Sequence, residues 1–94
     1  MSFKMTEKKL EKRCADIAKA NGWYTRKWSS PSSRGVPDRI FIRDGDVKFI
    51  EFKAFGKKPT KLQTYEMHMI NKKGGDVHWC DSVESFKLAM GIRT

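Results

Sequence analysis

The sequence predicts one domain of the α/β class over residues 1–94, with its elements in the order α-β-β-β-α-β-α. Three observations support this prediction. A chain of 94 residues has room for one hydrophobic core and not for two. Apolar residues recur at helical spacing in two segments. The dipeptide Asp44-Gly45, which is favoured in tight hairpin turns, joins two β-like runs.

The first third of the chain is expected to form a helix, a strand and a loop. Residues 6–20 are predicted as a helix because Thr6 is a suitable N-cap and an apolar stripe follows it, formed by Leu10, Cys14, Ile17 and Ala18. Asn21-Gly22 is expected to end this helix, since both residues tolerate the left-handed cap conformation. Residues 23–29 are rich in aromatic side chains and predict a strand, and residues 29–35 have the composition of a loop.

The rest of the chain is expected to contain a hairpin followed by an α-β-α segment. Residues 38–43 and 47–53 are the predicted hairpin strands, and residues 54–59 form a basic loop. Residues 60–73 predict a second helix with Leu62, Tyr65, Met69 and Ile70 on one side. Residues 77–80 predict a short strand, and residues 82–90 a last helix between a Ser82 cap and Gly91.

The chain is strongly basic. Its 20 Lys and Arg against 11 Asp and Glu give 20 − 11 = +9. The pI is about 9.8, above the value of about 9 that is typical of nucleic-acid-binding domains. The charge is uneven, since Lys57, Lys58 and Lys61 cluster in one expected loop and three arginines surround Asp38. Nucleic acid is therefore the expected partner; the alternative is a soluble protein that is merely rich in lysine.

Membrane, secreted and zinc proteins are disfavoured as classes. No apolar run approaches the roughly 20 residues of a membrane span, and no secretory signal precedes the first helix. A cytoplasmic location is therefore expected, with neither a membrane nor a small-molecule cofactor as partner. Cys14 and Cys80 are expected to be reduced core thiols. His78 and Cys80 form half of a zinc site, but no second ligand pair follows at metal spacing.

Two carboxylates in the predicted hairpin are candidates for a metal site. Phe49, Ile50 and Phe52 cover both faces of their run, which predicts a central strand around Glu51. A charge there is seldom buried without a partner or a metal. The Asp44-Gly45 turn brings Asp38 beside Glu51, and two adjacent carboxylates with water-filled open positions suit Mg²⁺. The alternatives are a turn role for Asp38 and an exposed ion pair between Glu51 and Lys53, which lie on one face of the strand.

The first two helices carry further candidates. Glu7 and Glu11 fall on the same edge of the first apolar stripe, so either is a possible third ligand. The helix dipole already accounts for an acid at Glu7 and explains Glu11 less well, so Glu11 is preferred. Thr60 and Gln63 have the spacing of a capping box, and this structural role alone would account for Gln63.

This combination of residues resembles the PD-(D/E)xK nuclease superfamily, and within it the VRR-NUC (virus-type replication-repair nuclease) family. The resemblance rests on the blocks Ser33-Arg34-Gly35-Val36-Pro37-Asp38, Ile50-Glu51-Phe52-Lys53 and Leu62-Gln63. The opening Glu7-x-x-Leu10-Glu11 and Gly22-Trp23 also look like that family's first helix. The similarity extends from about Thr6 to the last helix. A bare Asp…Glu-x-Lys is a weak signal, whereas the full set with its spacing is much more specific.

The resemblance implies a central mixed sheet flanked by helices and a catalytic site for DNA cleavage. In this family Glu11, Asp38 and Glu51 would bind a divalent metal, Mg²⁺ or Mn²⁺, with the backbone carbonyl of Phe52. Lys53 would be the catalytic lysine, and Gln63 would lie near the scissile phosphate. Short phage or bacterial members look like homodimeric resolvases of four-way (Holliday) junctions. Flap-type activity is less expected, because the extra domains of larger members are absent.

Four basic residues are the expected DNA contacts, and two other functions are alternatives to a structure-specific nuclease. Arg34 and Lys61 are candidates for clamping the phosphate, with Lys57 and Lys58 further along the backbone. The exposed faces of aromatics such as Trp28 or Trp79 are candidates for a dimer interface. One rival is a non-catalytic basic DNA-binding module. The other is a restriction-type nuclease, which ranks lower because no segment is large enough to read base sequence.

Overall fold

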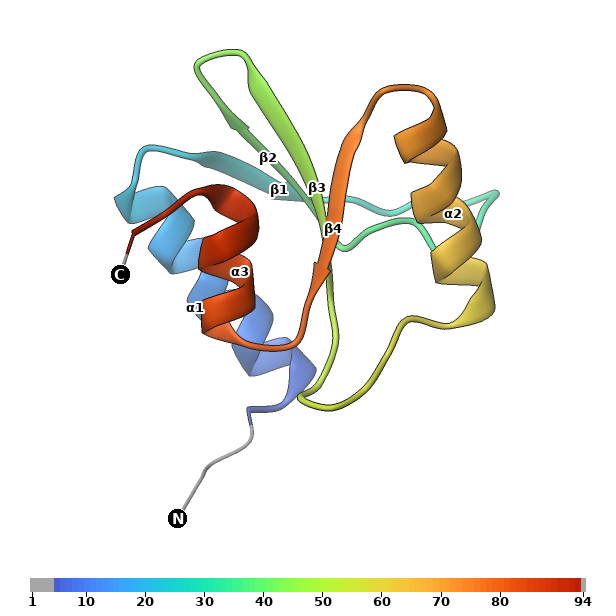
Figure 1. Cartoon of the computed structure of the whole chain (residues 1–94), viewed down its shortest axis with the longest axis horizontal. Helices are drawn as coiled ribbons and strands as arrows, with labels where there is room; N and C mark the ends of the chain where they lie inside the picture. The colour runs from blue at the N-terminus through green and yellow to red at the C-terminus, as the bar shows by residue number, and fades with distance from the viewer. Residues whose placement is uncertain (1–4, 94) are drawn as a thin grey trace.

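A four-stranded mixed sheet forms the centre of the computed structural model, which describes residues 5–93 (Figure 1). The strands lie in the order β1-β2-β3-β4. The observed order of elements, α-β-β-β-α-β-α, confirms the prediction. Their bounds are α1 Glu7–Ala20, β1 Tyr24–Lys27, β2 Arg39–Arg43, β3 Asp46–Phe52, α2 Lys61–Lys72, β4 Asp76–Cys80 and α3 Val83–Met90.

The sheet combines an antiparallel meander with one parallel strand. β1 pairs with β2 and β2 with β3 in antiparallel fashion, whereas β4 runs parallel to β3. β3 is therefore an interior strand, as its apolar content predicts. Asp44 and Gly45 have φ of 50° and 84° and form the turn between β2 and β3. Both central residues of a type I′ hairpin turn need such positive values.

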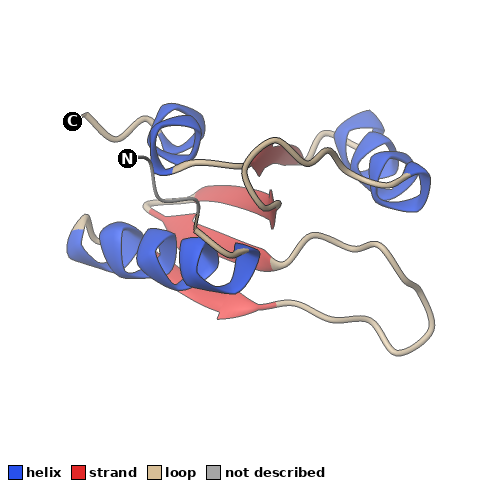
Figure 2. Ribbon diagram, turned by 90° about the horizontal axis from the view of Figure 1, so that it is seen from below, coloured by secondary structure: helices blue, strands red, loops and turns tan. Residues whose placement is uncertain are grey.

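The hydrophobic core lies between the sheet and helices α1 and α3. Both helices lie on one side of the sheet, and α2 lies on the other (Figures 1 and 2). The Phe86 ring of α3 packs against Phe41 and Phe52, with ring centroids 5.5 and 5.8 Å apart. The buried cluster comprises Leu10, Cys14, Ala18, Trp23, Phe41, Ile50, Phe52, Cys80, Phe86 and Met90.

Helix α2 contributes little to this core. None of its side chains is buried, and two members of its apolar stripe, Leu62 and Tyr65, are 47% and 55% exposed. The helix is instead defined by its N-terminal capping box, in which Thr60 and Gln63 exchange hydrogen bonds. The apolar periodicity therefore predicts the helix correctly, while the position of α2 serves the site described below.

Local differences from the predicted boundaries have simple causes. The strand predicted at residues 23–29 is shortened to Tyr24–Lys27, because the Trp23 N–H donates to the Ala18 carbonyl at the end of α1 at 3.0 Å. At the other end the Trp28 N–H still donates to the Asp38 carbonyl at 2.9 Å. The Trp28 ring lies over Phe49, with centroids 5.4 Å apart. Lys61, which is expected both in the basic loop cluster and in the helix predicted at residues 60–73, is the first residue of α2.

The two cysteines are unpaired and buried, in agreement with their prediction as core thiols. Burial raises the pKa of each thiol to about 12. Such thiols are protonated at neutral pH and therefore unreactive. Among residues 5–93, none of the helices has the length and apolar character needed to cross a membrane.

Candidate active site

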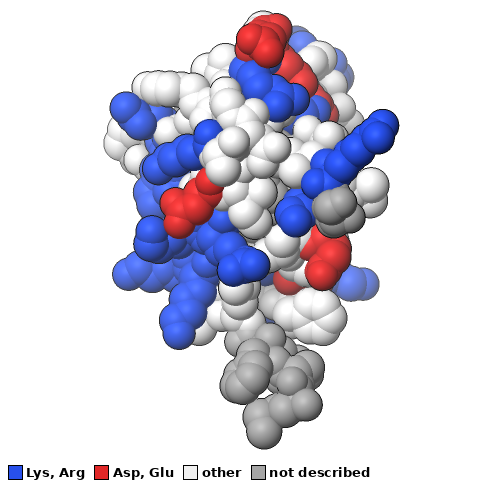
Figure 3. Space-filling model, turned by 90° about the vertical axis from the view of Figure 1, so that its left-hand side faces the viewer, with Lys and Arg blue, Asp and Glu red and all other residues white. Residues whose placement is uncertain are grey.

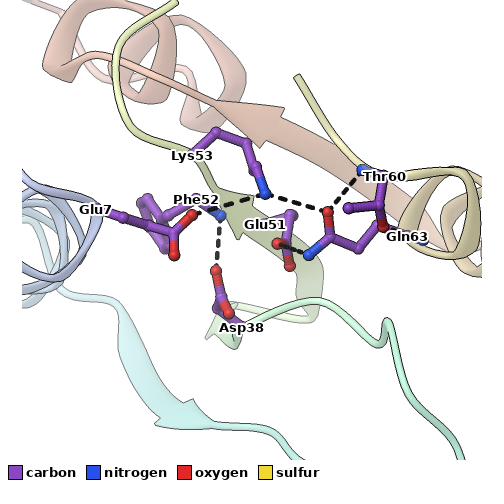
Figure 4. Close-up of polar contacts among 7 residues, drawn as sticks. All are labelled: Glu7, Asp38, Glu51, Phe52, Lys53, Thr60 and Gln63. Carbon is purple, nitrogen blue, oxygen red and sulfur yellow. Dashed lines mark hydrogen bonds and ion pairs between the residues drawn. The ribbon is translucent and has the colours of Figure 1, made fainter. Parts of the chain in front are cut away.

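The carboxylates of Asp38 and Glu51 meet where β2 begins and β3 ends (Figure 4). The hairpin register pairs Arg39 with Ile50, which places the preceding Asp38 opposite Glu51. The Phe52 N–H donates to Asp38 Oδ2 at 2.8 Å and holds this carboxylate against the end of β3. The two acids are thus neighbours, as the Asp44-Gly45 turn predicts.

Glu51 is a buried carboxylate that is only partly satisfied. Its residue is 2% exposed, and Oε2 accepts a hydrogen bond from Gln63 Nε2 at 2.7 Å. Its other oxygen, Oε1, is buried without a hydrogen-bond partner. Burial, followed by the charge of Asp38, raises the pKa of Glu51 to about 8. An unpaired buried oxygen of this kind is costly to the fold.

The pKa of Asp38 is also raised, and the main cause is again burial. The hydrogen bond from Phe52 opposes this shift, whereas the charges of Glu11 and Glu7 add to it. Two desolvated carboxylates in contact repel each other when both are ionised. A cation between them would remove that repulsion and give the orphaned Glu51 oxygen a partner.

The donor set fits a hard divalent cation. Within residues 5–93, no three carboxylate, imidazole or thiolate side chains converge as a complete metal centre. Mg²⁺ commonly binds through only one or two protein carboxylates and completes its shell with water and substrate phosphate. Asp38 and Glu51 supply such a pair, and the backbone of Phe52 lies directly beside Asp38.

Lys53 and Gln63 are joined to this pair by a continuous network. Lys53 Nζ donates to Gln63 Oε1 at 3.2 Å, and the Gln63 amide nitrogen donates to Glu51. The same Gln63 oxygen accepts the Thr60 N–H at 2.9 Å. The predicted capping box is therefore present, but its glutamine has a second set of contacts. One side chain starts α2 and also fixes the positions of Lys53 and Glu51 (Figure 4).

The two glutamates of α1 have different surroundings. Glu11 is 8% exposed, and its Oε2 forms ion pairs with Arg39 Nε at 2.8 Å and Lys27 Nζ at 3.2 Å. Glu7 in the first turn lies 3.8 Å from Lys53 Nζ and raises the pKa of both Asp38 and Glu51. The structure therefore brings Glu7 to Lys53, while the Glu11 carboxylate is already paired with two cations.

Comparison with known proteins places this arrangement in a family. No protein-family model matches the chain. The chain is 36% identical over 77 residues to "Putative nuclease p44" of Acyrthosiphon pisum secondary endosymbiont phage 1. The aligned region covers 81% of this chain and 83% of the phage protein. A solved structure described as "VRR_NUC domain" matches with a TM-score of 0.84 and 26% identity, over 93% of this chain and 97% of that chain. This chain belongs to the VRR-NUC nuclease family.

The family assignment agrees with the predicted resemblance and with the mixed sheet flanked by helices. It supports the general assignment of the chain as a DNA nuclease.

The predicted phosphate contacts of this VRR-NUC chain are solvent-exposed cations. Arg34, Lys57, Lys58 and Lys61 are all exposed, and within the described part of the chain none of them forms an ion pair. Arg34 precedes Gly35, where φ is +84° and a Cβ would lie 3.0 Å from the side chain of Leu62. The close approach at Gly35 holds the Arg34 loop against the start of α2.

Sequence reasoning missed Arg39 and Lys27 as partners of Glu11. In the sequence Arg39 is one of three arginines around Asp38, and no local pattern distinguishes Lys27 from the other lysines. Their ion pairs with Glu11 join residues that are far apart in the chain. For Arg39 a signal existed, because it alternates with the buried Phe41 along β2 and so points toward the helices on that face.

Proposed function

We propose that this VRR-NUC domain is a metal-dependent endonuclease that cuts branched DNA, such as a four-way junction, as a homodimer. The observation that carries the proposal is the buried pair Asp38 and Glu51, with one orphaned oxygen, beside Lys53. A protein that only binds DNA has no need for such a pair, which weakens the fold. The non-catalytic alternative leaves this arrangement unexplained.

Asp38 and Glu51 would hold Mg²⁺ or Mn²⁺ together with the Phe52 carbonyl. Glu7 is the helix residue that we favour beside them, since it faces Lys53 and influences both carboxylates. When bound, the metal supplies Lewis-acid charge at the phosphate and makes water easier to deprotonate. The carboxylates hold this charge at one position, so little reorganisation is needed during the reaction.

Lys53 would stabilise the negative charge that develops on the phosphate. Its side chain is 14% exposed, so its ammonium acts in a partly desolvated environment where electrostatic interactions are stronger than in water. Gln63 and Glu7 hold this ammonium from two sides. Gln63 also holds Glu51, so the two groups that act on the substrate keep a fixed relative position, and such positioning lowers the barrier to reaction.

The surface around the site favours recognition of DNA by shape. The net charge of +9 attracts the phosphate backbone, and Arg34 and Lys61 are the exposed cations that we place on the phosphates nearest to the cut. Lys57 and Lys58 would contact the backbone further away. Phosphate contacts of this kind carry no base sequence. A C2 homodimer would present two identical sites to a symmetric junction, and Trp79, which is 40% exposed, is a candidate for its interface.

Cleavage of matched substrates tests the proposal. A four-way junction, a flap and a linear duplex would each be incubated with the protein in Mg²⁺, Mn²⁺ or EDTA. The expected result is metal-dependent cutting with preference for the junction. Lys53→Ala should abolish cutting and leave DNA binding largely intact, whereas Lys73→Ala, an equal change of charge at an exposed position, should cut normally.

Each part of the proposal has its own contrary outcome. Failure of the folded protein to cut any substrate with either metal would overturn the nuclease assignment. Equal cutting of junction and duplex would overturn structure specificity, and sequence-dependent cutting of the duplex would favour the restriction-type alternative. The mass of the protein, alone and on junction DNA, measures the assembly, and a single copy per junction would exclude the homodimer.

A further inference from the structure

A basic groove runs along α1 on its β1 side. It encloses about 550 Å³ and is lined by six Lys or Arg side chains and two acidic ones, which gives 6 − 2 = +4. Lys8, Lys12 and Lys19 come from α1, and Lys27 and Arg39 come from β1 and β2. The sixth cation, Lys9, also comes from α1. We call this feature, defined by these six residues, the α1 groove. Figure 3 shows one face of the molecule on which Lys and Arg side chains gather in the lower half.

Three of these helix lysines form a straight row. Residues 8, 12 and 19 are four and seven positions apart, so at about 100° per residue they lie within about 40° of one line along α1. At about 1.5 Å per residue the row is about 16 Å long. One strand of B-DNA has a phosphate about every 3.4 Å of its axis. The row therefore matches about five nucleotides of a single backbone.

The positive charge of the row is not neutralised by the fold. Within residues 5–93, Lys8 and Lys19 form no ion pair. Lys12 pairs with Asp16 at 3.4 Å, but both side chains are more than half exposed, and such surface pairs contribute little. Glu11, at the floor of the groove, is already paired with Arg39 and Lys27. The groove thus presents a surplus of cations to solvent.

The end of the groove at Lys8 lies next along the chain to the proposed active site. Lys8 directly follows Glu7, which lies 3.8 Å from Lys53 Nζ. Arg39 directly follows Asp38 at the start of β2, with its side chain on the opposite face of the sheet, where it pairs with Glu11 of α1. A DNA backbone that reaches Lys53 and continues along α1 would pass Glu7 and then meet Lys8, the first cation of the α1 groove.

We infer that the α1 groove binds the phosphate backbone of one DNA strand over about five nucleotides to one side of the scissile phosphate. This inference rests on the proposed function for the position of the cut, but the groove's affinity for a DNA backbone is measurable without cleavage. It assigns a role to lysines of α1, outside the basic 54–61 segment. The DNA arm on this side would be held by charge alone, without recognition of base sequence.

A matched pair of double variants tests the groove. In a Lys53→Ala background, Lys8→Gln with Lys19→Gln removes two cations of the row. Lys72→Gln with Lys73→Gln removes two exposed cations at the far end of α2. Binding of a labelled four-way junction would be measured across a salt series. The groove variant should reduce the slope of log Kd against log salt by about 1 for each lysine removed, which is about 2 for one protomer and about 4 for a homodimer on the junction. The α2 variant should keep the parent slope.

A second measurement locates the contact. Once the cut is mapped, duplex arms are shortened from either side until they end about ten, five or two nucleotides from it. The difference between the parent and the groove variant should disappear when one particular arm becomes shorter than about five nucleotides. Equal slopes for the two double variants, or a difference that survives trimming of both arms to about two nucleotides, would overturn the inference.

The same series separates this inference from the proposed function. Wild-type protein that binds DNA through the groove but cuts no substrate would refute the nuclease activity and leave the groove in place. Wild-type protein that cuts, with groove and α2 variants that bind alike, would refute the groove alone. Circular dichroism of each variant checks that binding is compared between folded proteins.

Discussion

Replacing Glu51 with glutamine should stabilise the metal-free protein at neutral and higher pH. Glu51 is 2% exposed, one of its oxygens has no partner, and its pKa is raised from 4.5 to about 8. Between these two values the folded state holds a proton that the unfolded state releases. Stability from this group is therefore complete below about pH 4.5 and is lost as the pH rises through about 8.

The size of the effect follows from the displacement of the pKa. A tenfold change in proton affinity corresponds to about 1.4 kcal/mol, so a displacement from 4.5 to about 8 corresponds to about 5 kcal/mol. About 3 kcal/mol of this falls between about pH 5 and pH 8. The raised pKa of Asp38 acts in the same direction. Asp76, whose pKa is lowered from 3.8, loses its contribution only below this range. A loss of about 3 kcal/mol is large for a domain whose total stability is about 5 to 15 kcal/mol.

Urea unfolding in EDTA, repeated across this pH range, measures the prediction. The free energy of unfolding of the wild type should fall as the pH rises. That of Glu51→Gln should fall less, through Asp38 alone, and should exceed the wild type at about pH 8. Glu84→Gln, the same chemical change at an exposed position of α3, should keep the wild-type slope. A wild-type stability that is constant or rises over this range would refute the reasoning. Mg²⁺ should stabilise the wild type and have little effect on Glu51→Gln, because a ligand stabilises only the state that binds it.

Two further predictions concern the residues around this carboxylate. Thr60→Ala should cost about 1 kcal/mol of stability through the lost cap and leave the cleavage rate of folded protein unchanged. Gln63→Ala should lower the single-turnover rate by about tenfold to a hundredfold, since it also removes the hydrogen bonds to Lys53 and Glu51. Equal cleavage rates for the Thr60 and Gln63 variants would show that Gln63 acts only as a helix cap. Glu7→Gln should weaken the Mg²⁺ dependence of cleavage, whereas Glu11→Gln should lower the unfolding free energy by about 2 kcal/mol and leave cleavage intact. The reverse pattern in metal titrations and urea unfolding would assign the metal to Glu11.

The hairpin was predictable because its determinants are local. Asp44-Gly45 specifies the turn, and the turn sets the register of the strands on either side of it. Once Asp38 and Glu51 lie at matching distances from that turn, their proximity follows without knowledge of the remaining fold. The two helix caps at Thr60 and Ser82 were predictable for the same reason, since each requires residues only three positions apart.

The position of α2 and the second role of Gln63 were not predictable in this way. The apolar periodicity of residues 60–73 predicts a helix, but it does not say which surface covers its apolar side. In the structure Leu62 and Tyr65 remain exposed. The capping pattern likewise explains Gln63 by its own helix, whereas its contacts with Glu51 and Lys53 depend on how α2 is placed against β3. Each of these features depends on residues that are distant in the sequence.

The choice between Glu7 and Glu11 shows which further signal the sequence contained. Four residues of helix rotate by about 400°, so both glutamates lie within about 40° on the same edge of α1, and helical periodicity cannot separate them. Strand alternation can. Asp38 and Arg39 are adjacent, so their side chains point to opposite faces of the sheet, and Arg39 shares its face with Phe41, which is buried beneath the helices. An arginine on that face needs a carboxylate from the covering helix. Glu11, one turn further along α1 than Glu7, meets that need at 2.8 Å, and this leaves Glu7 at the helix start as the carboxylate beside Lys53.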